Sequence, residues 1–206
     1  IRRQRQMCIR DRIWAEYGTV LTKLANYEDS KDAYLKALDF KSDSPRVHLS
    51  LGHVYKTMGE IENSIDSYKN TIIQNKLSGE AYWSLANLKT YSFSENEIKA
   101  MEETLKADMS DIERSQMHFA LGKAYEVKKD FDNSFNNYFK GNEVKKGLTK
   151  YSSDDTTYNT KRILDFFNLE NIRDFSKSLT INQDPIFVLG MPRSGSTLID
   201  QIISSH

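Results

Sequence analysis

Apolar side chains recur along this chain at the spacing of one face of a helix. The clearest case is a pair of segments on either side of Gly59, in which apolar residues follow a period close to 3.6: Leu51, Val54, Tyr55 and Met58, then Ile61, Ile65, Tyr68 and Ile72. Most of the positions between them are polar. This pattern predicts two amphipathic helices that pack through their apolar faces, with Gly59 as the break between them.

The helix pair is one unit of an internal repeat. A small residue in the first helix returns after 34, 34 and 36 residues: Gly18, Gly52, Ala86 and Gly122. Because Gly inside a helix costs about 1 kcal/mol, its recurrence indicates that a second helix packs closely against it, which Ala86 permits nearly as well. Four units of helix, short turn and helix therefore cover about residues 14–147. Ser44 and Pro45 predict the N-cap and first helical residue of the second unit.

The repeat resembles the tetratricopeptide repeat (TPR), whose motif runs bulky-x-x-Leu-Gly-x-x-Tyr and later small-x-x-x-Tyr. Three units carry it most clearly: Trp14, Gly18, Tyr34 and Ala37; Leu51, Gly52, Tyr55, Ser64 and Tyr68; Leu121, Gly122, Tyr125, Ser134 and Tyr138. The third unit is degenerate, because Lys89, Ile98 and Glu102 stand in place of the tyrosine, the small residue and the aromatic residue.

This resemblance implies a mainly α fold, in which residues 13–147 form a TPR α-solenoid of helix-turn-helix repeats. We expect the motif residues to form the core between the helices. A solenoid also offers a concave surface for extended peptides or partner helices, so a protein or peptide ligand is the expected partner. The polar first-helix positions expected to line that surface are Lys23, Asn26, Lys56, Asn87, Lys123 and Lys128.

Residues 1–12 differ from the rest of the chain in composition. They hold five of the ten arginines and no lysine. Such a stretch is typical of a basic arm for nucleic acid or lipid, or of a tail that is disordered or not native to the protein. We favour the second interpretation and leave the segment out of the fold. The missing initiator Met and the abrupt end of the chain lead us to expect an N-terminal fragment.

The repeat pattern fades after residue 147, and residues 148–184 are predicted to form a helical linker. Asp154 or Asp155 is expected to cap a helix that runs to about Phe167. A polar stretch then begins near Ser176. We place the domain boundary near residues 180–184.

The last residues combine an apolar run, a loop and a helical pattern. The run PIFVLG, residues 185–190, predicts a buried strand of a parallel sheet. MPRSGST predicts a turn, and the apolar residues after it return at helical spacing: Leu198, Ile199, Ile202 and Ile203. A strand, loop and helix in this order direct backbone N–H groups and the positive end of the helix at one spot, which favours an anion.

The loop departs from the nucleotide-binding P-loop in one respect. Gly190 and Gly195 have the spacing of G-x-x-x-x-G-K-[ST], and Thr197 stands at the position of the magnesium-binding hydroxyl. Ser196, however, replaces the lysine that contacts the β- and γ-phosphates. Arg193 supplies a planar cation inside the loop, suited to sulfate or phosphate oxygens. This exchange favours a transfer that needs no triphosphate–magnesium clamp.

The segment resembles the 5′-phosphosulfate loop of sulfotransferases, F-[IV]-x-G-x-P-R-S-G-T-T-L, with Phe187, Val188 and Gly190 matching upstream. Together with the repeats, the order is similar to that of bacterial TPR sulfotransferases, which are related to tyrosylprotein sulfotransferases. Residues 185–206 would then be the truncated first strand-loop-helix of an α/β P-loop sulfotransferase domain. Ser196 departs from the usual Thr but keeps a hydroxyl and a backbone N–H.

The resemblance implies a donor, 3′-phosphoadenosine 5′-phosphosulfate (PAPS), and no metal. It assigns Arg193 as the catalytic residue that stabilises the moving charge. The donor-binding residues would be Pro192, Arg193, Ser194, Gly195, Ser196, Thr197 and Leu198. A general base and the 3′-phosphate ligands are expected beyond His206, so we expect the fragment alone to be inactive. The acceptor hydroxyl stays open among protein tyrosine, glycan and small molecule. The alternatives are a TPR interaction module without catalysis and a P-loop kinase.

Composition excludes several other classes. The 206 residues have a formal net charge of zero, so the chain lacks the basic field of nucleic-acid-binding proteins. No apolar run approaches the roughly 20 residues that span a bilayer. The single Cys8 excludes an intramolecular disulfide, and the four histidines show no metal-ligand spacing with it. We interpret His48 and His53 as packing or surface residues, and the protein as cytoplasmic and bacterial.

Overall fold

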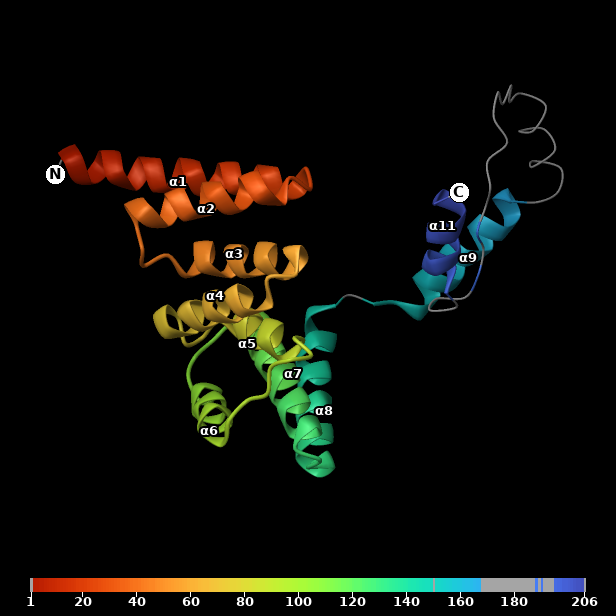
Figure 1. The fold of residues 1–206 in the computed structure, drawn as a ribbon. Helices are drawn as coiled ribbons and strands as arrows, with labels where there is room; N and C mark the ends of the chain where they lie inside the picture. Colours follow the sequence, from red (N-terminus) through yellow and green to blue (C-terminus); the bar gives the residue numbers. More distant parts are fainter. Residues whose placement is uncertain (1, 150, 168–187, 189, 191–194, 206) are drawn as a thin grey trace, which may run out of the picture. The chain divides into compact units, whose positions relative to one another are not determined.

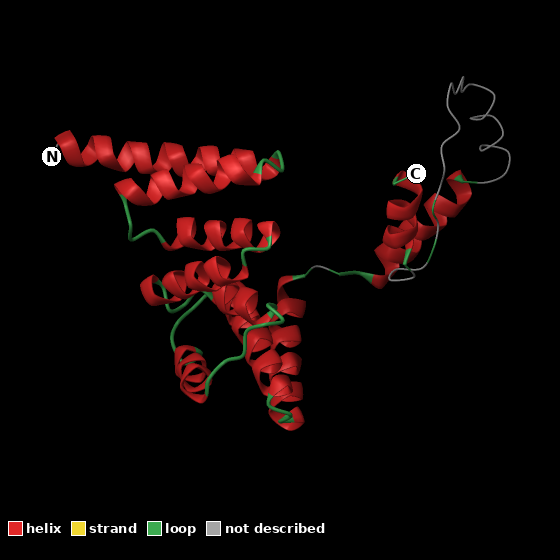
Figure 2. Cartoon of the chain, viewed as in Figure 1, coloured by secondary structure: helices red, strands yellow, loops and turns green. Residues whose placement is uncertain are grey.

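The computed structural model describes residues 2–149, 151–167, 188, 190 and 195–205, all of whose regular elements are helices (Figures 1 and 2). They are α1 (Arg2–Lys23), α2 (Tyr27–Phe40), α3 (Pro45–Met58), α4 (Ile61–Gln74), α5 (Gly79–Ala86), α6 (Glu95–Thr104), α7 (Asp111–Val127), α8 (Phe131–Leu148), α9 (Ser153–Phe166) and α11 (Ser196–Ser204). Contacts divide the chain into two units, residues 1–151 with α1–α8 and residues 152–206 with α9 and α11.

The part of the chain that covers residues 1–151 is the predicted solenoid. Helices α1 and α2, α3 and α4, and α7 and α8 pack as pairs, and α2 packs against α3 and α4 against α5 in turn. The pairs succeed one another in the chain order of Figure 1. The TPR architecture that the 34-residue period predicts is therefore confirmed.

In three of the four repeat units, the second helix packs against the first through the same contact. In the second unit, a Cβ placed on Gly52 would lie 2.6 Å from the ring of Tyr68, which is fully buried. The hydroxyl of Ser64 donates a hydrogen bond to the Gly52 carbonyl at 2.9 Å. The same serine bond joins two further pairs at 2.8 Å: Ser30 to Gly18, and Ser134 to Gly122. The small residue, the serine and the tyrosine of the motif thus act as one contact.

The third unit lacks this contact and has a different shape. Its first helix, α5, ends at Ala86, and residues 87–94 separate it from α6. The expectation of a short turn in every unit is therefore wrong here. Ile98 and Glu102 occupy the positions of the serine and the tyrosine, so neither the hydrogen bond nor the ring contact can form. Helices α5 and α6 instead both pack against α7, and their apolar side chains join a core that includes Leu85, Met101 and Leu121.

Local signals place several helix ends. Gly59 ends α3 with a φ of 84°, a conformation that Gly adopts without strain. Ser44 is the N-cap of α3 and Pro45 its first residue, as predicted, although the Ser44 side chain forms no capping bond. In the part of the chain after residue 151, α9 is capped by Ser152, whose hydroxyl accepts a hydrogen bond from the N–H of Asp155 at 3.1 Å. The expectation that Asp154 or Asp155 is the cap is therefore wrong, because both lie in the first turn.

The two ends of the chain bear on the remaining predictions. Helix α1 begins at Arg2, so residues 2–12 continue the helix that carries Trp14; whether this segment is native to the protein stays a prediction. Of the predicted strand 185–190, the described residues are Val188 and Gly190, and neither lies in a helix or strand. The predicted boundary near residues 180–184 lies outside the described residues.

Candidate functional site

The predicted anion loop ends in a turn that only glycine adopts easily. Gly195 has φ 88° and ψ 13°, the left-handed conformation, and is the N-cap of α11. Its carbonyl accepts hydrogen bonds from the N–H groups of Leu198 at 3.0 Å and Ile199 at 3.1 Å. Among the described residues, nothing caps the N–H groups of Ser196 and Thr197. With respect to the described residues, these two donors are unpaired at the positive end of the helix, where a negative charge is favoured.

Two of the predicted donor-binding residues share a small open hollow. Ser196 and Thr197 line it together with Val188 and Asp200, and its volume is about 310 Å³. Leu198 does not line this hollow; its side chain is 62% exposed, and its N–H is already bonded to Gly195. Pro192, Arg193 and Ser194 lie outside the described residues, so their predicted roles stay predictions.

Asp200 is a residue of this hollow that the sequence reasoning missed. It lies four residues after Ser196 in α11, so helical spacing alone would have placed it on the same face. Its carboxylate opposes the binding of an anion in the hollow. A cation from the loop, the predicted role of Arg193, would offset this repulsion.

The repeats form a second candidate site on one face of their first helices. Residues at equivalent positions of α3, α5 and α7 recur in the repeat register and form three rows: Arg46, Glu80 and Gln116; Leu49, Trp83 and Phe119; His53, Asn87 and Lys123. Members of the first two rows line a groove of about 440 Å³ between these helices. The rings of Trp83 and Phe119 lie 5.6 Å apart between centroids. The groove itself is mixed in charge, with Arg46, Glu80 and Glu113 in its lining, and the two rings do not line it.

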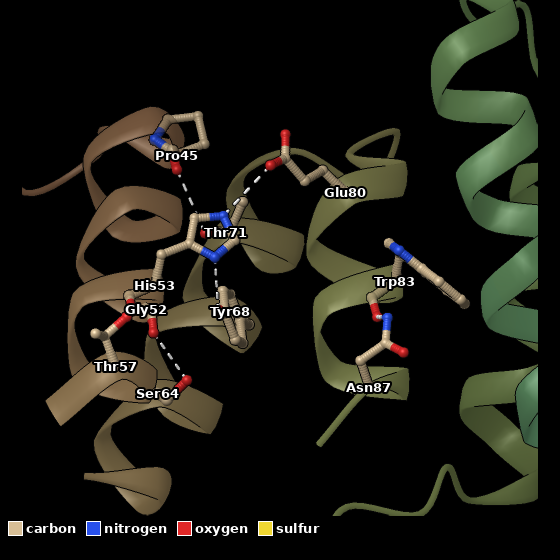
Figure 3. A network of polar contacts seen from close by, with 10 residues as sticks. All are labelled: Pro45, Gly52, His53, Thr57, Ser64, Tyr68, Thr71, Glu80, Trp83 and Asn87. Carbon is tan, nitrogen blue, oxygen red and sulfur yellow. Dashed lines mark hydrogen bonds and ion pairs between the residues drawn. The ribbon is translucent and has the colours of Figure 1, made fainter. Parts of the chain in front are cut away.

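A chain of polar contacts joins the core to this face (Figure 3). The hydroxyl of Tyr68 lies 2.8 Å from Nδ1 of His53, and Nε2 of His53 lies 3.3 Å from Oε1 of Glu80. The hydrogen bond from His53 and its positive charge hold the pKa of Glu80 below the ordinary value, against the opposing effect of burial. Burial raises the pKa of Tyr68. His53 thus connects α3, α4 and α5.

The residues predicted for the concave surface have different neighbours in the structure and do not form one surface row. Asn87 and Lys123 lie in the row of His53, with Lys123 paired to Glu126 at 3.1 Å. Lys128 instead pairs with Glu95 of α6 at 3.5 Å and lines a different hollow. The side chain of Asn26 bonds to Asp29 at the start of α2, and two further predicted residues are exposed: Lys23 and Lys56.

Sequence reasoning chose these residues by their polarity and missed His53, Glu80 and Trp83. The signal that could have found them is the repeat register, because Asn87 was chosen and His53 is its equivalent one unit earlier. No group of three metal-ligating side chains occurs among the described residues.

The contact between His53 and Glu80 predicts a pH dependence of stability. Because folding lowers the pKa of Glu80, its stabilising effect is present above the ordinary value of 4.5 and is lost as the pH falls through the lowered value. Glu80→Gln is therefore expected to lower the free energy of unfolding by less than ~1 kcal/mol near pH 6, since both groups are partly exposed, and by a smaller amount near pH 3. Urea unfolding across this range measures the difference. Glu62→Gln, an exposed change on α4, is the control, and an equal loss for Glu80→Gln at both pH values would contradict the prediction.

Two family models match the chain. Residues 18–59 match the TPR repeat model and residues 185–206 match the sulfotransferase family model. The resemblance to both families is therefore confirmed, and each match includes residues of the predicted motif. The repeats indicate a protein-interaction module. The match to sulfotransferases is short and covers the loop and α11. Among the described helices, none combines the length and apolar character needed to cross a membrane.

A relative and several solved structures match a large part of the chain. A protein of Aquifex aeolicus (strain VF5), described as uncharacterized, is 29% identical over 157 residues, which are 76% of this chain and 20% of that protein. The chain thus spans about a fifth of that relative. The MamA crystal structure aligns with a TM-score of 0.53 at 19% identity over 68% of this chain and 81% of that chain. Pseudomonas aeruginosa PilF aligns with 0.54 at 18% over 68% and 63%. At these identities the structures show the fold alone.

Proposed function

We propose that this chain, in which TPR repeats precede a segment of the sulfotransferase family, belongs to an enzyme that transfers a sulfuryl group from PAPS to an acceptor hydroxyl. The observation that carries the proposal is the match of residues 185–206 to the sulfotransferase family. It is supported by the start of α11 after Gly195, where no described residue caps the N–H groups of Ser196 and Thr197 and a helix N-terminus favours an anion.

The residues of the loop have distinct roles in this proposal. The N–H groups and hydroxyls of Ser196 and Thr197 hold the 5′-phosphosulfate of the donor. Arg193 stabilises the negative charge that builds on the bridging oxygen as the bond from sulfur to that oxygen breaks. The new bond joins sulfur to the acceptor oxygen, whose proton passes to a general base. The products are a sulfate ester and the 3′,5′-bisphosphate of adenosine.

The repeats recruit the acceptor or a partner in this proposal. The groove between α3, α5 and α7 offers the Arg46 cation and the Glu80 and Glu113 carboxylates, and the rings of Trp83 and Phe119 belong to the same helices α5 and α7. An extended segment or a helix of a protein acceptor suits such a surface. A cytoplasmic location is part of the same proposal.

Transfer of labelled sulfate from PAPS tests the proposal. Because the chain spans about a fifth of its relative, the experiment uses the full-length protein, with peptides containing tyrosine, oligosaccharides and phenols as trial acceptors. We expect label to appear in one class of acceptor with PAPS and no transfer with γ-labelled ATP, since Ser196 stands where a kinase loop carries lysine.

The other outcomes decide between the alternatives. Phosphoryl transfer from ATP would establish the kinase alternative. If the full-length protein neither binds PAPS in calorimetry nor transfers sulfate, while a protein ligand binds the repeats, the chain is an interaction module and the enzymatic proposal is wrong.

A further inference from the structure

A pocket on the repeats lies apart from the groove and from the anion loop. It is formed by α4, α5, α6 and the segment before α6, and its volume is about 530 Å³. Its apolar wall includes Ile72 of α4, Tyr82 and Leu85 of α5, and Phe93. Pockets of 300–1,000 Å³ with a largely apolar lining are typical of small-molecule sites.

The pocket lies beside the degenerate third unit. In the other units the ring of a tyrosine in the second helix packs on a small residue of the first, as Tyr68 does on Gly52. The third unit has Glu102 in place of that ring, and α6 packs against α7 while residues 87–94 carry the chain around from α5. Figure 1 shows α6 at the end of this long connection. Residues of α4, α5 and α6 line the pocket, whereas Glu102 lines a different hollow.

The two glutamates that line the pocket already have hydrogen-bond or ion-pair partners. Glu97 accepts hydrogen bonds from the hydroxyl of Tyr91 and from Ser94, and Glu103 pairs with Lys106 at 2.6 Å.

Two lysines on the opposite side line the same pocket. Neither Lys69 nor Lys76 has a carboxylate within ion-pair distance among the described residues; Lys69 lies 5.0 Å from the centre of the Tyr91 ring. Against the effect of burial, the hydrogen bonds from Tyr91 and Ser94 and the charge of Lys69 hold the pKa of Glu97 below the ordinary value, so Lys76 is the less engaged of the two cations.

We propose that this pocket binds a small amphiphile with an apolar body and one anionic head group, of the alkyl carboxylate or aryl sulfonate type. The apolar body lies against Tyr82, Leu85 and Phe93. The head group lies at the mouth, within reach of Lys69 and Lys76. Neither the fold nor the proposed sulfuryl transfer requires this ligand, so the test is independent of the enzymatic proposal.

Two dyes that differ in one group make the test sharp. 1-Anilinonaphthalene-8-sulfonate carries the anionic group, and N-phenyl-1-naphthylamine is the same molecule without it. Both fluoresce more strongly in an apolar site. We expect the sulfonate to bind at least about tenfold more tightly than the neutral dye, because two lysines each contribute part of a charge-assisted contact. Decanoate should displace the sulfonate at a lower concentration than decanol.

Variants assign the binding to the pocket. Lys69→Gln with Lys76→Gln is expected to weaken sulfonate binding about tenfold and leave the neutral dye unchanged. Ala100 is an exposed residue of α6 that lines the pocket, so Ala100→Phe fills the space without removing a core side chain and should abolish the binding of both dyes. Each lysine is also changed singly, and the matched control for each single change is Lys146→Gln, an equal change of charge on α8.

The dyes also distinguish this pocket from other apolar surfaces. Helix α8 exposes Phe131, Phe135 and Phe139, where a dye could bind nonspecifically. Sulfonate binding that survives Ala100→Phe in a variant with unchanged circular dichroism and thermal unfolding would overturn the assignment to the pocket. Equal weakening of both dyes by the lysine changes, or equal weakening by Lys146→Gln, would overturn the anionic head group.

Discussion

Replacing Arg193 with alanine in the full-length protein is expected to lower kcat for sulfuryl transfer by about 100- to 1000-fold. Removing one oriented group that stabilises charge in the transition state has effects of this size. Arg193 is the cation of the loop in which Ser196 replaces the usual lysine, so no other loop residue can take over. Asp200 lines the hollow of Ser196 and Thr197 and repels an anion there, so without the cation of the loop PAPS binding is expected to weaken as well.

Steady-state kinetics with labelled PAPS measure this change. Arg193→Lys keeps the charge but loses the planar fork, so it is expected to recover part of the rate. Arg162→Ala, in α9, is the matched control because it removes the same side chain outside the loop. A variant Arg193→Ala with unchanged kcat would show that the loop arginine stabilises no charge in the reaction.

The second large effect is on stability. Gly52→Ala is expected to lower the free energy of unfolding by about 2 kcal/mol, because the added methyl group would lie 2.6 Å from the Tyr68 ring. Tyr68 is fully buried and bonded to His53, so its ring cannot swing aside into solvent. The loss outweighs the gain of up to ~1 kcal/mol that Ala normally brings inside a helix.

Gly147→Ala is the matched control for this prediction. Gly147 also lies in a helix, α8, but a Cβ there meets no heavy atom within 4 Å. It is therefore expected to raise stability slightly while Gly52→Ala lowers it. Urea unfolding followed by circular dichroism gives both values, and changes of the same sign would contradict the proposed role of the Gly52 contact.

The repeats were predictable because their packing contact is encoded at fixed offsets. The pairing of Gly52 with Ser64 and Tyr68 returns in other units at the same spacing, so the period revealed the helix pairs without a structure. The third unit was predicted less well. Its motif residues are missing, and no local pattern shows that a chain which leaves α5 at Ala86 forms α6 only at Glu95. The path between them follows from packing against α7.

For the candidate sites too, local features were predictable from the sequence and long-range contacts were not. The loop motif predicted the order of turn and helix, and Gly195 with α11 agrees with it. The hollow at Asp200 depends on which side of α11 faces Val188, which the motif does not specify. On the repeats, polarity led to lysines such as Lys128, whose partner Glu95 comes from another unit. Partners that are distant in sequence are set by the fold rather than by local composition.

The missing contact of the third unit also bears on how the repeats hold together. In a linear array each unit is stabilised by its own helix pair and by its neighbours, so cooperativity is passed along from unit to unit. Units one and two carry the Gly–Tyr–Ser contact and unit four carries it again, whereas α5 and α6 depend on α7. The array is therefore expected to unfold as two cooperative blocks joined at α5, and not as one.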